Sequence, residues 1–178
     1  AAAQALAGFP DPAGYLDVAW RWLLQNHPHD SICGCSIDAV HEDMKYRFRQ
    51  CEGIAERITT EATRCLSAAI AEPLADGAVR VTVFNPLAEP FEGTTELTLS
   101  IPLDWPSFNE FFGFEPKPAF RIYGADGAEI AYQRLAQEMG RSKVRIRATR
   151  FPEGYRANDV TISLPLRVPA LGYTTLTV

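Results

Sequence analysis

A long helical pattern in the first half of the chain constrains the fold more than any other feature. Apolar or small residues recur at steps of three and four at Ile37, Val40, Met44, Phe48, Cys51, Ile54, Ile58, Ala62, Cys65 and Ala69. This spacing places them on one face of an α-helix, and Pro73 is the first residue that must interrupt it. We therefore predict one helix over about Ile37 to Ala71, ~35 residues and ~50 Å long, with Ser36 as its N-cap. Gly53 is its weakest position, costing ~1 kcal/mol relative to alanine.

A shorter helix is predicted before the long one. Asp11 followed by Pro12 is typical of a helix start, and apolar residues then mark one face at Leu16, Ala19, Trp20, Leu23 and Leu24. This helix must end near Asn26 or His27, because Pro28 disfavours helical geometry in the residue before it. We expect it to run antiparallel to the long helix. With residues 1–7 read as the tail of a further helix, residues 1–72 form a helical hairpin or three-helix bundle.

The second half of the chain changes from a helical to a strand period. Residues 73–78 have the composition of a linker, and strands are predicted over residues 80–84, 94–101, 120–123, 129–132, 143–151, 159–168 and 173–178. A hairpin turn is expected at residues 124–127. Strands at this spacing indicate an antiparallel β-sandwich over residues 79–178. The predicted fold class is therefore α+β, with a helical bundle followed by a sandwich.

A long loop over residues 102–118 interrupts the strand pattern. It carries Trp105, Phe108, Phe111, Phe112 and Phe114. A loop of this kind either packs against a neighbouring domain or stacks on a ligand. We favour packing, because large aromatic side chains are usually buried.

The charge balance argues against two classes of partner. The chain has 17 Lys and Arg against 22 Asp and Glu, a net charge of −5, with the basic residues scattered among acids. Such a charge balance argues against binding to nucleic acid or to an anionic membrane surface. No run approaches the ~18 apolar residues that a membrane span needs.

The four cysteines do not form a shared metal cluster. Cys51 and Cys65 are 14 residues apart on the long helix, which separates them by ~21 Å. That distance excludes a common zinc ion and a disulfide between the two. Reduced and mostly buried thiols are expected, which favours an intracellular, cytoplasmic protein.

The stretch between the two helices, from Asn26 to Ser36, gathers chemically active side chains. It holds His27, His29, Asp30, Cys33 and Cys35. Neither helix can run through it, because Pro28 removes a backbone donor and Gly34 favours a turn. Short polar segments between rigid elements often form sites. A simple helix–helix connector remains the alternative.

The run from Ala19 to Asp38, and above all its segment His27-Pro28-His29-Asp30-Ser31-Ile32-Cys33-Gly34-Cys35-Ser36, resembles the middle domain of glycoside hydrolase family 38 α-mannosidases. It is most similar to the bacterial branch that includes mannosylglycerate hydrolases. Residues 83–86 and 168–173 are similar to the opening part of that family's C-terminal β domain. The resemblance therefore extends over nearly the whole chain.

The resemblance implies roles for two residues. His29 takes the position of a ligand to the active-site divalent metal, usually zinc, and Asp30 that of a carboxylate that binds sugar hydroxyls. His27 is one position away from the match and is interpreted as a supporting or structural residue. Imidazole is a good zinc ligand, and a carboxylate can accept hydrogen bonds from two adjacent hydroxyls.

The resemblance also implies that the chain is a fragment. In the family, the catalytic aspartate and the other metal ligands lie on an N-terminal α/β barrel, so no catalytic residue is assigned here. The expected function is part of a metal-dependent retaining α-mannosidase acting on a mannoside or mannosylated glycan, with the barrel of the same parent chain as partner. The fragment alone is expected to be inactive and to hold no metal tightly. The alternative is a stand-alone carbohydrate-binding module using the loop from Trp105 to Phe114, or a purely structural module.

Overall fold

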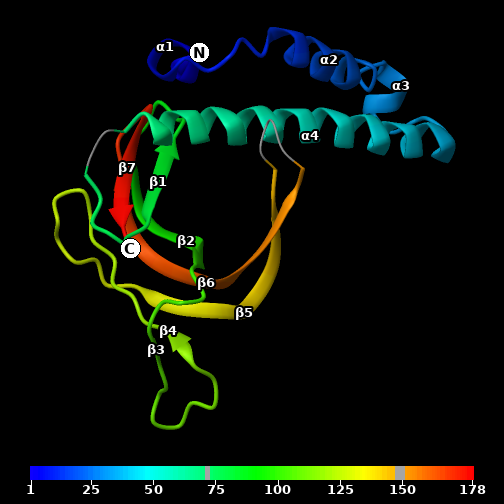
Figure 1. Cartoon of the computed structure of the whole chain (residues 1–178). Helices are drawn as coiled ribbons and strands as arrows, with labels where there is room; N and C mark the ends of the chain where they lie inside the picture. Colours follow the sequence, from blue (N-terminus) through cyan, green and yellow to red (C-terminus); the bar gives the residue numbers. More distant parts are fainter. Residues whose placement is uncertain (71–72, 147–150) are drawn as a thin grey trace. The chain divides into compact units, whose positions relative to one another are not determined.

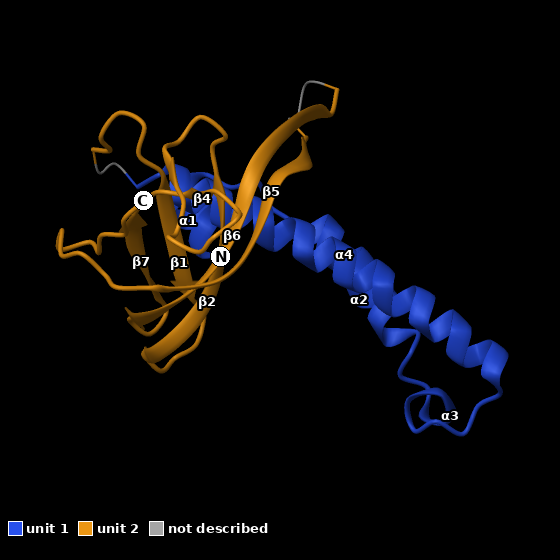
Figure 2. Cartoon of the chain, turned by 90° about the horizontal axis from the view of Figure 1, so that it is seen from below, with its two compact units in different colours: residues 1–72 blue, residues 73–178 orange. Residues whose placement is uncertain are grey.

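The computed structural model describes residues 1–70, 73–146 and 151–178. The chain divides into two compact units, Ala1–Glu72 and Pro73–Val178, coloured separately in Figure 2. The first unit is helical and the second contains antiparallel sheets. The α+β class predicted from the sequence is confirmed.

The described part of the helical unit contains four helices, of which one is long and one is a short helix in a connector. These are α1 (Ala2–Ala7), α2 (Ala13–Leu24), α3 (His29–Ile32) and α4 (Asp38–Ala68). Both α1 and α2 contact α4, and α2 runs antiparallel to α4, as Figure 1 shows. At the start of α2, Asp11 Oδ1 accepts a hydrogen bond from the Ala13 N–H at 3.1 Å. The N-cap of α2 is Pro12, so the predicted start with Asp11 as cap and Pro12 as first helical residue is wrong by one residue, although the Asp11 carboxylate binds the first N–H of the helix.

The long helix is confirmed, with corrections at both ends. It runs without a break through Gly53. The free-energy cost of this glycine is therefore offset by the other interactions that stabilise the helix. Its N-cap is Ile37, with no side-chain hydrogen bond, so the prediction of Ser36 as the cap is wrong by one residue. The helix ends at Ala68, where Ala69 N–H bonds to Cys65 O and Leu66 O. Ala71, the predicted end, lies outside the described residues.

The helical unit buries few apolar side chains. Ala3, Ala19 and Met44 are its buried hydrophobic residues among those described. The rings of Trp22 and Tyr46 meet edge to face with centroids 5.7 Å apart, which joins α2 to α4. The Cys65 thiol lies 3.1 Å from the Ala7 carbonyl oxygen and so joins α4 to the end of α1.

The predicted buried face of α2 is only partly correct. Ala19 is buried and Leu23 is half-buried, whereas Leu16, Trp20 and Leu24 are exposed. The apolar residues of α2 cover more than the single stripe that α4 contacts. Periodicity alone could not show which edge of this broad apolar surface faces the partner helix.

Within its described residues, the second unit contains seven strands in three antiparallel sheets. The strands are β1 (Arg80–Asn85), β2 (Phe91–Ile101), β3 (Ser107–Phe108), β4 (Lys117–Pro118), β5 (Gln133–Arg145), β6 (Glu153–Val168) and β7 (Gly172–Thr177). Their orders are β1-β7, β2-β6-β5 and β3-β4. The alternation expected in β2 is present, with Leu97 half-buried, Leu99 and Ile101 buried, and the residues between them exposed.

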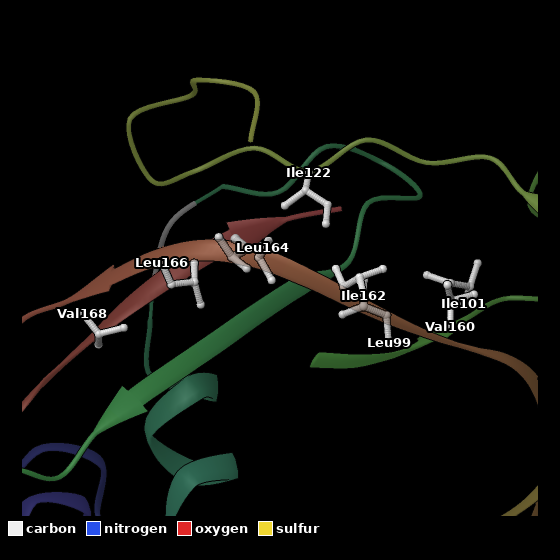
Figure 3. Packing of buried hydrophobic residues seen from close by; sticks show 9 residues of the cluster. Leu99, Ile101, Ile122, Val160, Ile162, Leu164, Leu166 and Val168 are labelled. Atoms are coloured by element: carbon white, nitrogen blue, oxygen red, sulfur yellow. The ribbon is translucent and has the colours of Figure 1, made fainter. Parts of the chain in front are cut away.

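One core lies between the two larger sheets. Its buried members are Leu99, Ile101, Ile122, Val160, Ile162, Leu164, Leu166, Val168 and Leu176, and Figure 3 shows the side chains that line β6 and β2. Val81 and Val83 of β1 pack against this cluster from the smaller sheet. The central strand β6 supplies most of the core because it pairs with β2 on one side and β5 on the other.

Two strand predictions need correction. The strand expected over residues 143–151 is instead the end of β5, which starts ten residues earlier at Gln133. Residues 147–150 lie outside the described part of the chain. Phe151 is exposed and does not belong to a strand. The register of β5 shifts twice, and Gly140 has φ of 61°. These bulges break the two-residue alternation on which the prediction relied. The segments predicted as strands at 120–123 and 129–132 are joined by the isolated bridge Tyr123↔Glu129, and Tyr123 also forms a bridge with Thr177.

The aromatic loop packs only at its base. Trp105 packs against the core, and the short strands β3 and β4 pair above it. Phe111, Phe112 and Phe114 at the tip are 94%, 86% and 101% exposed. The core of this chain therefore does not bury them, and their packing against a neighbouring domain stays a prediction. Within the described residues, no helix is both long and apolar enough to cross a membrane.

Candidate functional site

The candidate site lies in the connector between α2 and α4. The chain leaves α2 in a tight turn, with Asn26 N–H bonded to Leu23 O at 3.0 Å and His27 N–H to Leu24 O at 3.1 Å. Pro28 then takes φ −51° and ψ 139°, an extended conformation that starts a new helix, α3. Four residues of the connector, His29–Ile32, form this single helical turn.

Asn26 anchors the start of the connector. Its side chain is fully buried, with 0% exposure. Its Nδ2 donates a hydrogen bond to the Met44 carbonyl oxygen at 3.0 Å, and its Oδ1 accepts a longer bond from Arg47 Nη1 at 3.5 Å. A buried amide satisfied by a neighbouring helix fixes the position of the chain that follows it. Sequence reasoning used Asn26 only as a helix end and missed this role, because its partners are 18 and 21 residues away.

His29 and Asp30 occupy the first two positions of α3. The His29 Nε2 lies 3.3 Å from Asp30 Oδ1, and the two side chains are 93% and 68% exposed. An imidazole and a carboxylate therefore lie side by side at the surface, where both can bind an external group. His27 is also exposed. The structure brings the side chains of His29 and Asp30 together.

The connector contains side chains that can bind a metal ion. Across the described residues, no three His, Cys, Asp or Glu side chains gather closely enough to hold a metal ion. A zinc ion in a protein takes three or four protein ligands. His29 can supply one exposed imidazole on a short rigid helix, which fits a ligand set completed by residues from elsewhere.

The end of the connector is fixed by a second contact. His41 Nε2 lies 3.0 Å from the Ser36 carbonyl oxygen, so this histidine binds the backbone just before α4. The third histidine of the chain is therefore structural. Ser36 still acts at the helix start, but through its backbone carbonyl rather than the predicted side-chain cap.

The cysteines differ from the expectation of mostly buried thiols. Cys33 and Cys35 are exposed, whereas Cys51 and Cys65 are half-buried, and all four are free thiols. Cysteine is usually buried, but Cys33 and Cys35 lie in the turn that ends α3 and have no core to enter.

Comparison with known proteins places this architecture in a class. No protein-family model matches the chain. Its fold is similar to that of an α-mannosidase from Enterococcus faecalis V583, with a TM-score of 0.83, 25% identity and coverage of 99% of this chain and 21% of that one. A second structure, of a protein in glycosyl hydrolase family 38 from Enterococcus faecalis, has the same fold with a TM-score of 0.76 and 23% identity. This similarity covers 98% of this chain and 21% of the second protein. The chain thus has the fold of a segment that makes up 21% of each of these two proteins.

One curated relative is more similar over a shorter stretch. It is named "Putative mannosylglycerate hydrolase", from Halalkalibacterium halodurans, and is 53% identical over 56 residues, which make up 32% of this chain and 6% of the relative. The resemblance to family 38 α-mannosidases is therefore confirmed by sequence and by fold. The chain spans about a fifth of the length of the solved structures that it matches.

Proposed function

We propose that the chain is the helical middle portion and first β portion of a metal-dependent retaining α-mannosidase. The observation that carries this proposal is the exposed His29–Asp30 pair, displayed on a one-turn helix between α2 and α4. Similarity to an α-mannosidase over 99% of the chain supports the class of enzyme. The connector supplies an accessible pair of polar groups whose position is fixed by packed helices.

His29 is proposed to donate one imidazole to a divalent metal, zinc in the first instance. When bound, this ion would act as a Lewis acid toward the hydroxyls of the sugar. The imidazole side chain is free of the core, and α3 begins directly at His29, so the ring extends from a rigid turn. The remaining ligands are proposed to come from the N-terminal barrel of the same parent chain.

Asp30 is proposed to bind the sugar itself. Its carboxylate is exposed and lies beside His29, so a mannoside held near the imidazole could donate two hydroxyl hydrogen bonds to it. Such bonds would orient the ring for attack by a nucleophile on the barrel, the carboxylate chemistry of a retaining glycosidase. The chain alone is proposed to be inactive, because it is not assigned a nucleophile.

The proposal is tested by three alanine variants in the intact parent protein. His29→Ala should lower turnover by more than ~100-fold and reduce the metal content, because a ligand is lost. Asp30→Ala should retain metal and mainly weaken binding of the sugar and its transition state. His27→Ala is the matched control, an exposed imidazole two residues away, and should have the mildest effect.

Kinetics and elemental analysis are measured together on the three variants. If His29→Ala keeps full metal content and near-native turnover, the ligand assignment is wrong and the connector is structural. Circular dichroism of each variant shows whether the helical unit is still folded.

A second candidate function rests on the aromatic loop. Phe111, Phe112 and Phe114 are exposed at its tip, and the first two rings contact each other edge to face with centroids 4.8 Å apart. Exposed rings can stack on the apolar face of a sugar, so the chain could act as a carbohydrate-binding module. Titration of mannosides and other glycans into the chain separates the two functions. Binding by the chain alone that is lost in Phe111→Ala and Phe114→Ala would favour the module.

A further inference from the structure

The turn that ends α3 carries two exposed thiols. Cys33 and Cys35 lie on either side of Gly34, and their Sγ atoms are 3.6 Å apart. We propose that this pair is a reversible dithiol–disulfide site, a redox modification site that does not depend on the mannosidase proposal. Its substrate class is small-molecule disulfides such as oxidised glutathione.

The backbone holds the two thiols in a closed arrangement. Gly34 N–H bonds to Ser31 O at 3.2 Å and Cys35 N–H bonds to Asp30 O at 2.9 Å. Gly34 has φ of 82°, in the left-handed region that favours glycine. This pattern is the Schellman motif of helix C-termini. The turn therefore brings the thiols together before any bond forms, which lowers the entropic cost of closing the ring.

The geometry is compatible with a disulfide. Closure requires the Sγ atoms to approach from 3.6 Å to ~2.05 Å, with Cα atoms within ~7 Å of each other. Consecutive Cα atoms lie ~3.8 Å apart, so two cysteines separated by one residue cannot exceed ~7.6 Å. The turn at Gly34 shortens this distance further. The proposal requires rotation of the two side chains to close the ring without a change of fold.

The other two cysteines provide an internal comparison. Cys51 and Cys65 both lie on α4 and are half-buried. Their separation of 14 residues along one helix corresponds to ~21 Å. These thiols can form a mixed disulfide with glutathione only where they become accessible, and they cannot form a disulfide with each other.

The reaction consists of two thiol–disulfide exchanges. One thiolate of the pair attacks a sulfur of oxidised glutathione, forming a mixed disulfide and releasing one glutathione thiolate. The second thiolate attacks the protein sulfur of that mixed disulfide and releases the other glutathione. The protein loses two electrons and two protons, and oxidised glutathione is reduced to two glutathione molecules. Both steps need exposed sulfur atoms, which the turn provides.

The test uses redox buffers of reduced and oxidised glutathione. The intact protein is equilibrated, quenched with acid, alkylated and digested with trypsin. Cleavage after Arg21 and Lys45 places Cys33 and Cys35 on the peptide of residues 22–45, while Cys51 and Cys65 fall on two other peptides. Mass spectrometry therefore reports the pair separately from its comparison thiols.

We expect the peptide of residues 22–45 to lose two hydrogens, to resist alkylation and to recover its thiols with dithiothreitol. Its oxidised fraction should fall as the squared concentration of reduced glutathione, divided by the concentration of oxidised glutathione, increases. This dependence is the one that a two-electron couple requires. Cys33→Ser and Cys35→Ser should each leave only a mixed disulfide on the remaining thiol, whereas Cys51→Ser combined with Cys65→Ser should oxidise like the wild type. Recovery of the peptide with two alkyl groups, or with two glutathiones, across the whole range would overturn the proposal.

Discussion

The buried Asn26 offers the sharpest test of how the connector is held. In Asn26→Ala, the helical unit loses the 3.0 Å bond from Asn26 Nδ2 to Met44 O, whose net contribution is ~1 kcal/mol. The void left by three heavy atoms adds at most ~1 kcal/mol. Met44 lies inside α4 and its carbonyl keeps its helical partner, so no acceptor is orphaned. The expected loss in free energy of unfolding is therefore ~1–2 kcal/mol.

Two further variants make this prediction specific. Gln25→Ala changes the exposed neighbour of Asn26 at the C-cap of α2 and should alter stability by less than ~0.5 kcal/mol. Asn26→Asp cannot donate to Met44 O and places a carboxylate against that carbonyl. At neutral pH, Asn26→Asp should lower the free energy of unfolding more than Asn26→Ala does. The difference should decrease as the pH falls, because a protonated carboxyl group can again donate a hydrogen bond to Met44 O.

The assay is urea unfolding followed by helical circular dichroism, which reports mainly on the helical unit. If Asn26→Ala is as stable as Gln25→Ala, the amide does not anchor the connector and the reasoning is wrong. If Asn26→Asp is more stable than Asn26→Ala at neutral pH, the partner that matters is Arg47 rather than Met44.

Two other predictions concern charge and metal. Burial raises the pKa of Asp159, but hydrogen bonds from Lys143 and Ser100 outweigh it and leave the pKa below its ordinary value. The ionised Asp159 carboxylate therefore stabilises the folded β unit at pH values above the ordinary pKa of an aspartate. This stabilisation is lost as the pH falls through the lower pKa that the group has in the folded state. Asp159→Asn should destabilise the β unit at neutral pH and flatten its acid dependence in urea unfolding, whereas the exposed Glu96→Gln should not. Dialysis of the chain alone against a mild chelator should leave no stoichiometric zinc by elemental analysis; one tightly held ion would mean that His29 has a complete ligand set within this chain.

The long helix could be predicted because its signal is local. Ten apolar or small residues at helical spacing and the absence of proline before Pro73 determine α4 almost to its ends. The strand β2 was equally clear, since its alternation from Thr95 to Ile101 matches its burial. The bulged strand β5 was not, because Gly140 and two register shifts move its side chains out of phase.

The sequence motif singles out the residues of the candidate site, whose roles stay predictions, but it does not reveal the contacts that support them. His29 and Asp30 follow from a motif of neighbouring residues, and the structure displays them side by side. The Asn26–Met44 contact depends on the antiparallel packing of α2 on α4, which no local pattern encodes. The exposure of Cys33 and Cys35 was missed for a different reason: cysteine is usually buried, whereas these two flank the turn at Gly34 and lie at the surface.

The position of the connector depends on few contacts. The helical unit buries only small or flexible apolar residues among those described, namely Ala3, Ala19 and Met44. The chain before α3 is held by Asn26 on the Met44 carbonyl, and the chain after α3 is held by His41 on the Ser36 carbonyl. Both contacts are side-chain bonds to backbone carbonyls, which fix direction as well as distance. His29 and Asp30 lie between these two anchors, so loss of either anchor should displace the pair while leaving both side chains chemically intact.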